Sequence, residues 1–333
     1  MRLPKSIPGF LTLSLSIASI ALLIVFFLVL AILNRMPEGE PEFGITFSTV
    51  YARQLGIDWK LAYTDLVQNV GVKRVRLPIY WDEVEKEKNE YDWEHYDWIV
   101  EESELNNVEL TIVLGQKVPR WPECFIPDWA EKIDPHNTYD ELNEFIALAV
   151  GRYKDSPALH RWQIENEALF PFGECPRPSV EEYAGEIALV RELDPDHQIQ
   201  ITVSGELEPY FNSAVPADVL GISMYRITWN NLFGYFYYPI TPAFYRAKAK
   251  VVEPFVDSVI ISELQAEPWF PEAIDAREPQ EWYEVFTEKD MRRNIDFARR
   301  TGLDEAYLWG AEWWYFLKEN GEPRLWNVAE ELF

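Results

Sequence analysis

Short apolar runs alternate with longer amphipathic segments from residue 43 to the end of the chain. Eight runs have the length and β-branched or aromatic content of buried strands: Phe43–Phe47, Lys73–Pro78, Val108–Leu114, His160–Asn166, Gln198–Ser204, Val219–Tyr225, Ser258–Glu263 and Ala306–Gly310. Helical patterns lie between them at Asp58–Val70, Trp93–Asn106, Tyr139–Tyr153, Ser179–Leu193, Pro242–Val256 and Glu288–Thr301. The short, proline-broken segment between the fifth and sixth runs carries the weakest helical pattern.

This alternation predicts an α/β fold with parallel strands. Eight units over roughly 290 residues favour a (β/α)8 TIM barrel over an open doubly wound sheet, and no glycine-rich dinucleotide fingerprint follows the first run. Three helices are expected to begin with polar caps, at Thr138, Ser179 and Thr287.

The amino-terminal run Phe10–Leu33 has 24 residues and no charge. At the helical rise it would extend roughly 36 Å, which predicts one transmembrane helix. Arg2 and Lys5 precede the run, and acidic residues follow it. This bias predicts a cytoplasmic amino terminus and an extracytoplasmic remainder. A cleaved signal peptide is the alternative, although the run is long for one and no small-x-small cleavage site follows it.

The predicted organisation therefore has three parts: a cytoplasmic stub and membrane anchor at 1–35, a linker rich in Glu and Pro at 36–42, and the barrel at 43–333. Cys124 and Cys175 lie in proline-rich segments after two successive strands. If these are neighbouring loops, an oxidising compartment would permit a disulfide between them; two free thiols are the alternative.

Composition limits the partners. The chain has 56 acidic and 30 basic residues, a net charge of −26. This balance argues against nucleic acid or an anionic membrane surface as a partner and suits a neutral substrate, although solubility alone is an equally simple explanation of the charge. Fourteen Trp residues beside many carboxylates suit a sugar-binding cleft. The four His residues have no metal-ligand spacing, so neither a metal nor a cofactor is expected.

Two of the apolar runs end near a glutamate. The run Trp162–Glu167 ends in Asn166-Glu167, and Ser258–Glu263 ends in Glu263. In a (β/α)8 barrel the catalytic groups stand at the carboxyl ends of the strands, so both glutamates are expected at one rim. Retaining glycoside hydrolases need such a pair, one acid and one nucleophile about 5 Å apart.

The sequence Trp162-Gln163-Ile164-Glu165-Asn166-Glu167 resembles the fourth-strand motif of the retaining (β/α)8 glycoside hydrolase clan that includes cellulase-like and β-galactosidase-like families. Arg76-Leu77-Pro78 is similar to the clan's Arg-x-Pro. Glu263 and Trp309 match its nucleophile and its sugar-stacking Trp, and the resemblance spans about residues 43–315. The resemblance implies that Trp309 forms the floor of the subsite for the attacked sugar.

The resemblance also implies roles for the other residues. Glu167 would be the general acid/base and Glu263 the nucleophile, kept ionised by Arg76 and by a hydroxyl such as that of Tyr225. Asn166 would bind the sugar 2-hydroxyl. The chain would then cleave β-linked glycans with retention, using these two glutamates.

Rival assignments stay open. Glu165 is two residues from Glu167, so on a continuing strand both would face the same way, and Glu267 is the nearest rival of Glu263. Departures from the clan, such as Ala168 after Glu167, leave the sugar open. A transglycosylase with the same residues and a non-catalytic glycan-binding barrel are the alternative functions.

Overall fold

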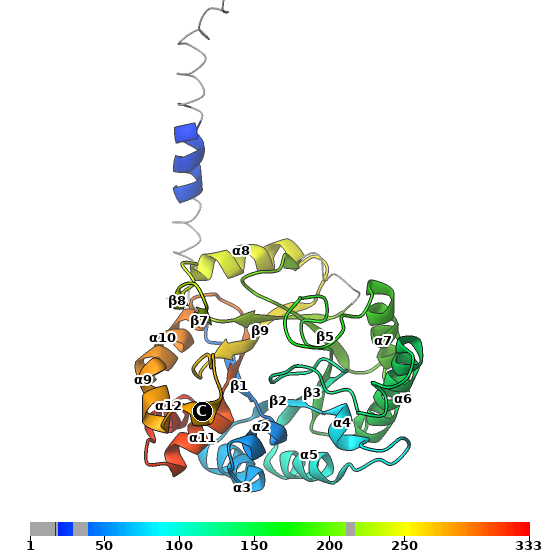
Figure 1. Cartoon of the computed structure of the whole chain (residues 1–333). Helices are drawn as coiled ribbons and strands as arrows, with labels where there is room; N and C mark the ends of the chain where they lie inside the picture. Colours follow the sequence, from blue (N-terminus) through cyan, green and yellow to red (C-terminus); the bar gives the residue numbers. More distant parts are fainter. Residues whose placement is uncertain (1–16, 18, 29–38, 211–216) are drawn as a thin grey trace, which may run out of the picture.

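The computed structural model describes residues 17, 19–28, 39–210 and 217–333. Eight parallel strands close into a barrel surrounded by helices, so the predicted (β/α)8 fold is confirmed (Figure 1). Each barrel strand pairs with the barrel strands before and after it along the chain. The strands are β1 (Glu42–Thr46), β2 (Arg74–Pro78), β3 (Glu109–Leu114), β4 (Leu159–Ile164), β5 (Gln198–Val203), β6 (Val219–Met224), β9 (Ser258–Gln265) and β10 (Glu305–Trp309).

The helices alternate with these strands along the chain. They are α2 (Thr49–Gln54), α3 (Trp59–Thr64), α4 (Trp81–Val84), α5 (Glu94–Asn106), α6 (Pro135–Tyr153), α7 (Val180–Leu193), α8 (Pro242–Val252), α9 (Pro279–Val285), α10 (Glu288–Arg299), α11 (Ala311–Glu319) and α12 (Arg324–Leu332). α3 continues as a π-helix over Asp65–Val70, and a 3₁₀ turn occupies Ile274–Ala276.

The helix starts agree with the sequence at two of three predicted caps. Ser179 and Thr287 each form a capping box with the residue three positions on. Thr138 is not a cap, because α6 begins earlier: the Asp134 side chain accepts a backbone hydrogen bond and Pro135 occupies the first helical position. Between β5 and β6 the described residues, 204–210 and 217–218, contain no α-helix. The rest of that segment lies outside the described residues.

Alternation along each strand divides the side chains between the barrel interior and the helix layer. In β4, Trp162 is buried on the helix side, where its indole donates to Asp194 at 2.8 Å. Gln163 points inward and accepts hydrogen bonds from Arg76 at 2.7 Å and Gln200 at 2.8 Å. The interior is therefore polar at mid-height, and its groups are bonded to each other as burial requires.

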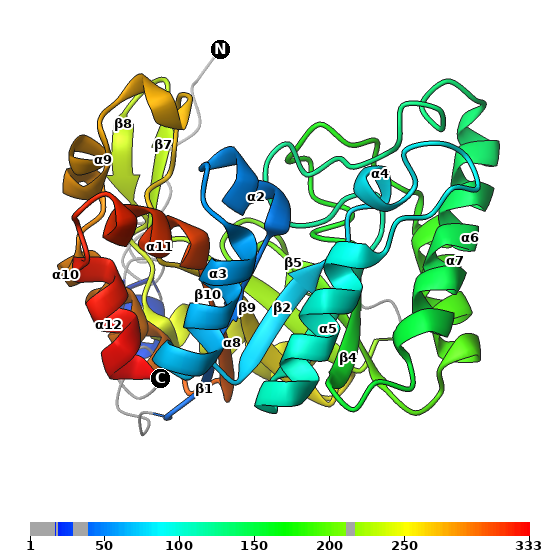
Figure 2. The same cartoon turned by 90° about the horizontal axis from the view of Figure 1, so that it is seen from below.

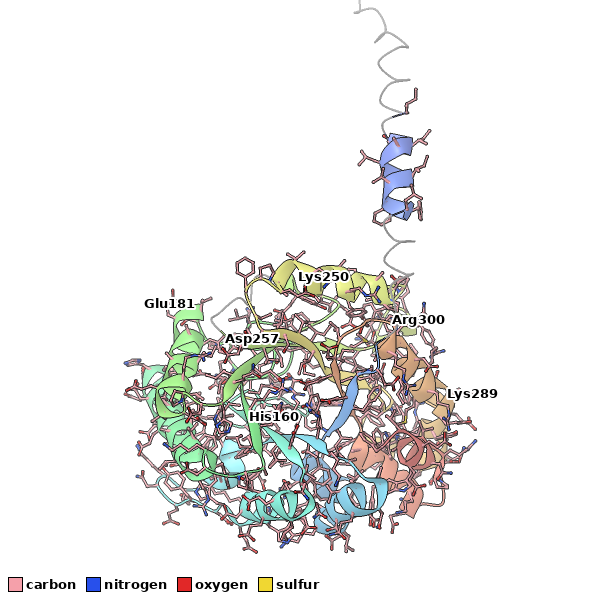
Figure 3. The ribbon with its side chains drawn as sticks, turned by 180° about the vertical axis from the view of Figure 1, so that it is seen from behind. His160, Glu181, Lys250, Asp257, Lys289 and Arg300 are labelled. Atoms are coloured by element: carbon pink, nitrogen blue, oxygen red, sulfur yellow. A yellow bond between two sulfur atoms is a disulfide. The ribbon has the colours of Figure 1, made fainter. Side chains whose placement is uncertain are left out.

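At the amino-terminal end of the strands, the Arg161 guanidinium binds both oxygens of Glu305 at 2.7 Å. Figure 3 shows the barrel from this amino-terminal end, where His160 and Asp257 lie near the starts of β4 and β9. Gly44 of β1 lies against the Tyr307 ring, and an added Cβ would come within 2.8 Å of that ring. The packing of these groups closes this end of the barrel and leaves the other end for a site.

An antiparallel hairpin of β7 (Ile227–Asn230) and β8 (Gly234–Tyr237) extends beyond the barrel at the carboxyl ends of the strands (Figure 2). The hairpin follows the sixth barrel strand, β6, and is rich in aromatic residues: Trp229 lies on β7, and Tyr235, Phe236 and Tyr237 lie on β8. The Tyr235 hydroxyl donates to the Trp269 carbonyl at 2.9 Å, which ties the hairpin to the loop after β9.

The predicted membrane anchor, Phe10–Leu33, lies mostly outside the described residues. Residues 17 and 19–28 are helical, and their large apolar side chains are exposed. Within the described parts of the chain, no helix has both the length and the apolar character needed to cross a membrane.

Candidate active site

The chain turns sharply where β4 ends. Glu165 and Glu167 have φ values of +55° and +46°, in the left-handed region that non-glycine residues rarely occupy. The two side chains therefore enter different surroundings, which corrects the expectation that a continuing strand would make them face the same way. The Glu165 carboxylate accepts the backbone N–H groups of Gln116 at 2.9 Å and Lys117 at 2.7 Å. Glu165 thus organises the loop after β3.

Glu263 lies two residues before the end of β9, beside an irregularity in the strand pairing. Ile222 pairs with Ile261, but Ser223 pairs with Glu263, so β9 carries an extra residue, Ser262. Bulges of this kind re-aim side chains next to functional sites. Here the bulge brings the Glu263 carboxylate into the barrel mouth, where its side chain is 4% exposed.

Both oxygens of Glu263 accept hydrogen bonds from the predicted partners. The Arg76 Nη1 donates to Oε1 at 2.8 Å, and the Tyr225 hydroxyl donates to Oε2 at 3.0 Å. Arg76 is completely buried. The Glu263 carboxylate thus has a charged donor on one oxygen and a hydroxyl on the other.

Arg76 also reaches Asn166, since its Nη2 donates to the Asn166 Oδ1 at 2.6 Å. Thr202 donates to the same oxygen at 3.2 Å and accepts the backbone N–H of Glu167 at 2.8 Å. Two donors on Oδ1 fix the orientation of the amide, so Nδ2 is the atom through which Asn166 can donate. The structure thus brings Arg76, Asn166, Glu167, Glu263 and Tyr225 together at one rim, as predicted.

Glu167 has surroundings unlike those of Glu263. Burial, followed by the negative charges of Glu263 and Glu123, raises the pKa of Glu167 well above its usual value. The Lys117 ammonium and a hydrogen bond from Ser223 oppose this shift but do not reverse it. These surroundings therefore favour the protonated form of Glu167, whereas Glu263 is bound by two donors.

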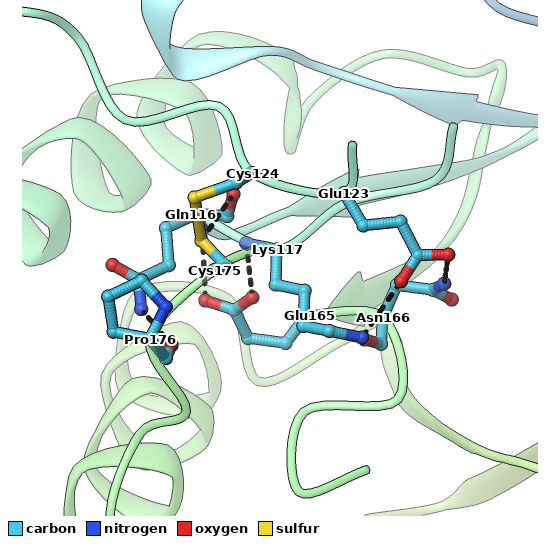
Figure 4. The surroundings of a disulfide bond; sticks show 8 residues. All are labelled: Gln116, Lys117, Glu123, Cys124, Glu165, Asn166, Cys175 and Pro176. Carbon is cyan, nitrogen blue, oxygen red and sulfur yellow. Dashed lines mark hydrogen bonds and ion pairs between the residues drawn. A yellow bond between two sulfur atoms is a disulfide. The ribbon is translucent and has the colours of Figure 1, made fainter. Parts of the chain in front are cut away.

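Two charged residues of the site, both in the loop after β3, were not among the residues predicted from the sequence. The buried Lys117 Nζ donates to Glu123 Oε2 at 2.9 Å and to the Asn166 carbonyl at 2.7 Å. The Glu123 Oε1 lies 3.5 Å from the Asn166 Nδ2 (Figure 4). No strand pattern covers this loop. The only available signal was charged residues placed among prolines beside a cysteine.

The predicted disulfide between Cys124 and Cys175 is confirmed (Figure 4). It joins the loop after β3 to the loop after β4, with their Cα atoms 4.6 Å apart. These are the neighbouring loops of one rim that the sequence predicted.

Trp309 ends β10 as expected, but a cation covers one face of its ring. The Arg120 guanidinium lies 4.2 Å from the Trp309 ring centroid and 3.9 Å from that of Tyr51. Arg120 also binds Glu267 and Glu312, each at 2.5 Å. Only the other face of Trp309 could stack on a sugar, and the residue is 7% exposed.

The charged residues around Arg120 include Glu267, the alternative candidate for the nucleophile. Burial raises the pKa of Glu267 to about 7, with a further contribution from the Glu312 charge and an opposing one from Arg120. Glu267 is paired with Arg120, which also binds Glu312, whereas Glu263 is paired with Arg76. Glu263, with Arg76 and Tyr225, is the carboxylate next to Glu167.

Aromatic rings cross the rim above these polar groups. Trp121 contacts Phe172, Phe172 contacts Trp269, and Trp269 contacts Tyr225, with ring centroids 6.0, 5.8 and 5.7 Å apart. Trp121 is 61% exposed. The rings offer apolar faces beside buried acids, the combination that sugar binding uses. No cluster of three or more metal-ligating side chains occurs in the described residues.

No protein-family model and no curated protein sequence matches the chain. Solved structures do. A xylanase from Paenibacillus barcinonensis is 16% identical with a TM-score of 0.54, covering 81% of this chain and 84% of its own. A GH5_18 protein from Streptomyces cattleya is 12% identical with a TM-score of 0.53, and the match covers 82% of this chain and 70% of that protein. A β-galactosidase from Halorubrum lacusprofundi is 15% identical with a TM-score of 0.54, and the match covers 87% of this chain and 57% of that protein.

Identities this low carry an argument about the fold and not about the substrate. The chain therefore shares the (β/α)8 barrel fold of these solved structures.

Proposed function

We propose that the chain is a retaining glycoside hydrolase that acts on neutral β-linked glycans. The observation that carries this proposal is the contrast between two neighbouring carboxyl groups. Glu167 is buried beside negative charges, which favours its protonated form, and Glu263 is bound by Arg76 and Tyr225. One acid and one carboxylate at the same rim are the two groups that double displacement requires.

In the first step, a Glu263 oxygen attacks the anomeric carbon while the bond to the leaving oxygen breaks. Glu167 gives its proton to that oxygen, and a glycosyl ester of Glu263 forms. Esterification removes the Glu263 charge, which is one of the causes that raise the pKa of Glu167. The pKa of Glu167 then falls, so it can take a proton from the water that attacks the ester and releases Glu263.

Asn166 is positioned for the transition state. Arg76 and Thr202 hold its carbonyl oxygen, which leaves Nδ2 to donate to the sugar 2-hydroxyl. In retaining enzymes this interaction strengthens as the oxocarbenium-like state develops. The uncovered face of Trp309 would bound the same subsite.

The charges of the site favour a neutral sugar. Each buried cation beside the two glutamates already has a carboxylate partner: Arg76 binds Glu263, Lys117 binds Glu123, and Arg120 binds Glu267. A uronate or a sulfate ester would have to compete for these cations. The net charge of −26 would also repel polyanionic glycans.

Covalent trapping tests the proposal. We would incubate residues 39–333 with a panel of 2-deoxy-2-fluoro glycosyl fluorides and locate adducts by mass spectrometry. We expect one glycosyl group on Glu263, absent from Glu263→Gln. An adduct on Glu267 would overturn the assignment of Glu263 as the nucleophile. A product whose anomeric configuration is inverted, as monitored by NMR, would overturn the retaining mechanism.

Two alternatives keep the same geometry. A transglycosylase would pass the glycosyl group of Glu263 to a second sugar, and product analysis with added acceptor sugars distinguishes it. A non-catalytic glycan-binding barrel would bind oligosaccharides without turnover or labelling. The presence of both an acid and an anchored carboxylate favours the enzymes.

We also propose that the barrel is tethered to a membrane with its active site outside the cytoplasm. The uncharged run Phe10–Leu33 and the disulfide between Cys124 and Cys175, which suits an oxidising compartment, support this placement. The full chain should remain with membranes after alkaline carbonate extraction, and residues 39–333 should not. Release of the full chain by carbonate would contradict the anchor.

A further inference from the structure

A third carboxylate, that of Glu123, lies beside the two proposed catalytic glutamates. Its Oε1 is 3.5 Å from the Asn166 Nδ2, the nitrogen that the proposed mechanism assigns to the sugar 2-hydroxyl. We propose that Glu123 is a substrate-binding residue that accepts a hydrogen bond from a sugar hydroxyl next to the one bound by Asn166. This inference rests on the proposed glycosidase site.

The backbone at Glu123 is held in an unusual conformation. Its φ is +57°, and that of Arg120 is +90°. Such conformations cost about 1 kcal/mol or more for a non-glycine residue and persist where the surroundings impose them. With this backbone, Glu123 turns toward Lys117 and Asn166, while the next residue, Cys124, turns to Cys175 (Figure 4).

The loop after β4 fixes Glu123 from the other side. Besides the disulfide, the Glu174 N–H donates to the Pro122 carbonyl at 3.0 Å. Gly173 has a φ of +81°, and a Cβ there would lie 2.9 Å from the Pro122 oxygen and 3.0 Å from the Glu123 Cβ. The absence of a side chain at Gly173 thus allows the two loops to meet. The disulfide and the Glu174 hydrogen bond therefore hold the loop on both sides of Glu123.

The simpler interpretation is that Glu123 only neutralises the buried Lys117. That contact uses Oε2, at 2.9 Å. A carboxylate has about four acceptor sites, and the long contact with Asn166 leaves Oε1 able to accept a better donor. Glu123 also lies close enough to Glu263 that the Glu263 charge contributes to raising its pKa, after burial. Its position therefore faces the reacting centre as well as Lys117.

Substrates lacking one hydroxyl separate the two interpretations. We would measure kcat/KM of the full chain and of Glu123→Gln with aryl β-glycosides and their monodeoxy analogues. A Gln can still accept a hydrogen bond, but it loses the charge, so we expect a loss of about 10- to 100-fold. For one deoxy analogue, the one without the hydroxyl that Glu123 binds, the loss should shrink to about twofold. A purely structural role predicts the same loss for every analogue.

Glu174→Gln is the matched control, because it removes an exposed carboxylate from the facing loop. Its activity should equal that of the unmodified chain. If Glu123→Gln does not fold, Glu123→Asp keeps the charge opposite Lys117 but withdraws the acceptor by one methylene, and it should give the same analogue pattern. Uniform losses across all analogues with Glu123→Asp or Glu123→Gln would overturn the proposal.

Calorimetry separates this inference from the glycosidase proposal. We would measure binding of the same glycosides to Glu263→Gln and to the Glu123→Gln/Glu263→Gln double variant. If nothing turns over but binding still depends on Glu123 for one hydroxyl, the proposed reaction fails and the binding role stands. If turnover occurs and Glu123→Gln behaves as the control does, the reaction stands and the binding role fails.

Discussion

The guanidinium of Arg76 and the carboxylate of Glu263 form a buried ion pair, with Nη1 and Oε1 2.8 Å apart and side-chain exposures of 0% and 4%. Arg76 lies on β2 and Glu263 on β9, so the pair spans the barrel. The other two donor groups of Arg76 bind Gln163 and Asn166, both near the end of β4. One side chain therefore couples the proposed nucleophile to the strand that carries the proposed acid.

Removal of Arg76 should cost both stability and activity. In Arg76→Met the Glu263 carboxylate loses its counter-charge while buried, which typically destabilises a protein by about 3–5 kcal/mol. Denaturant unfolding of residues 39–333 would measure this loss. Glu263→Gln removes the charge, so Arg76→Met should cost much less in that background. If Arg76→Met lowers the free energy of unfolding equally in both backgrounds, the loss of the Arg76–Glu263 ion pair is not the cause of the destabilisation.

Glu167→Gln should separate the two chemical steps. A Gln cannot donate a proton, so cleavage of glycosides with poor leaving groups should fall by about 10²–10⁴-fold. Dinitrophenyl glycosides need no proton, so they should still release a burst of phenolate before hydrolysis stalls. Stopped-flow absorbance would detect the burst. A uniform loss for both kinds of substrate would contradict the acid/base role.

The pH profile adds a control to this prediction. Because burial and the charges of Glu263 and Glu123 raise the pKa of Glu167, the acid should remain protonated up to a higher pH than an exposed glutamate would. With glycosides whose leaving group needs a proton, the alkaline decline of kcat/KM should therefore be absent from the residual activity of Glu167→Gln. It should persist in Glu165→Gln, because Glu165 binds backbone N–H groups of the neighbouring loop.

The residues that the sequence identified stand at the ends of regular strands. Apolar runs fixed the positions of β4 and β9, and strand order then placed Glu167 and Glu263 at one rim. Arg76, Asn166 and Tyr225 were identified through the resemblance of their segments to known motifs. Periodicity is a local property, so it sufficed where the backbone stays extended.

The missed features depend on contacts between distant segments. The left-handed conformations of Glu165 and Glu167 reflect bonds to the loop after β3, which no local pattern encodes. Glu123 reaches the site because its loop meets the loop that contains Gly173. Arg120 covers Trp309 through a similar long-range contact. Loop conformations of this kind require the assembled barrel.

Glu206 should make the folded barrel less stable as the pH rises. It accepts hydrogen bonds from the Tyr245 hydroxyl and the Tyr225 backbone N–H, and burial raises its pKa from 4.5 to about 7. Between these values the folded chain binds more protons than the unfolded chain, so this contribution is complete below pH 4.5 and is lost as the pH rises toward 7.

The variant Glu206→Gln tests this effect, because Gln keeps the hydrogen-bond acceptor and cannot ionise. Glu206→Gln should therefore match the unmodified protein near pH 4.5 and exceed its free energy of unfolding by about 1–2 kcal/mol at pH 8, since water screens part of the charge. Urea unfolding of residues 39–333 at both pH values tests this, and an equal difference at the two would show that Glu206 does not titrate in this range.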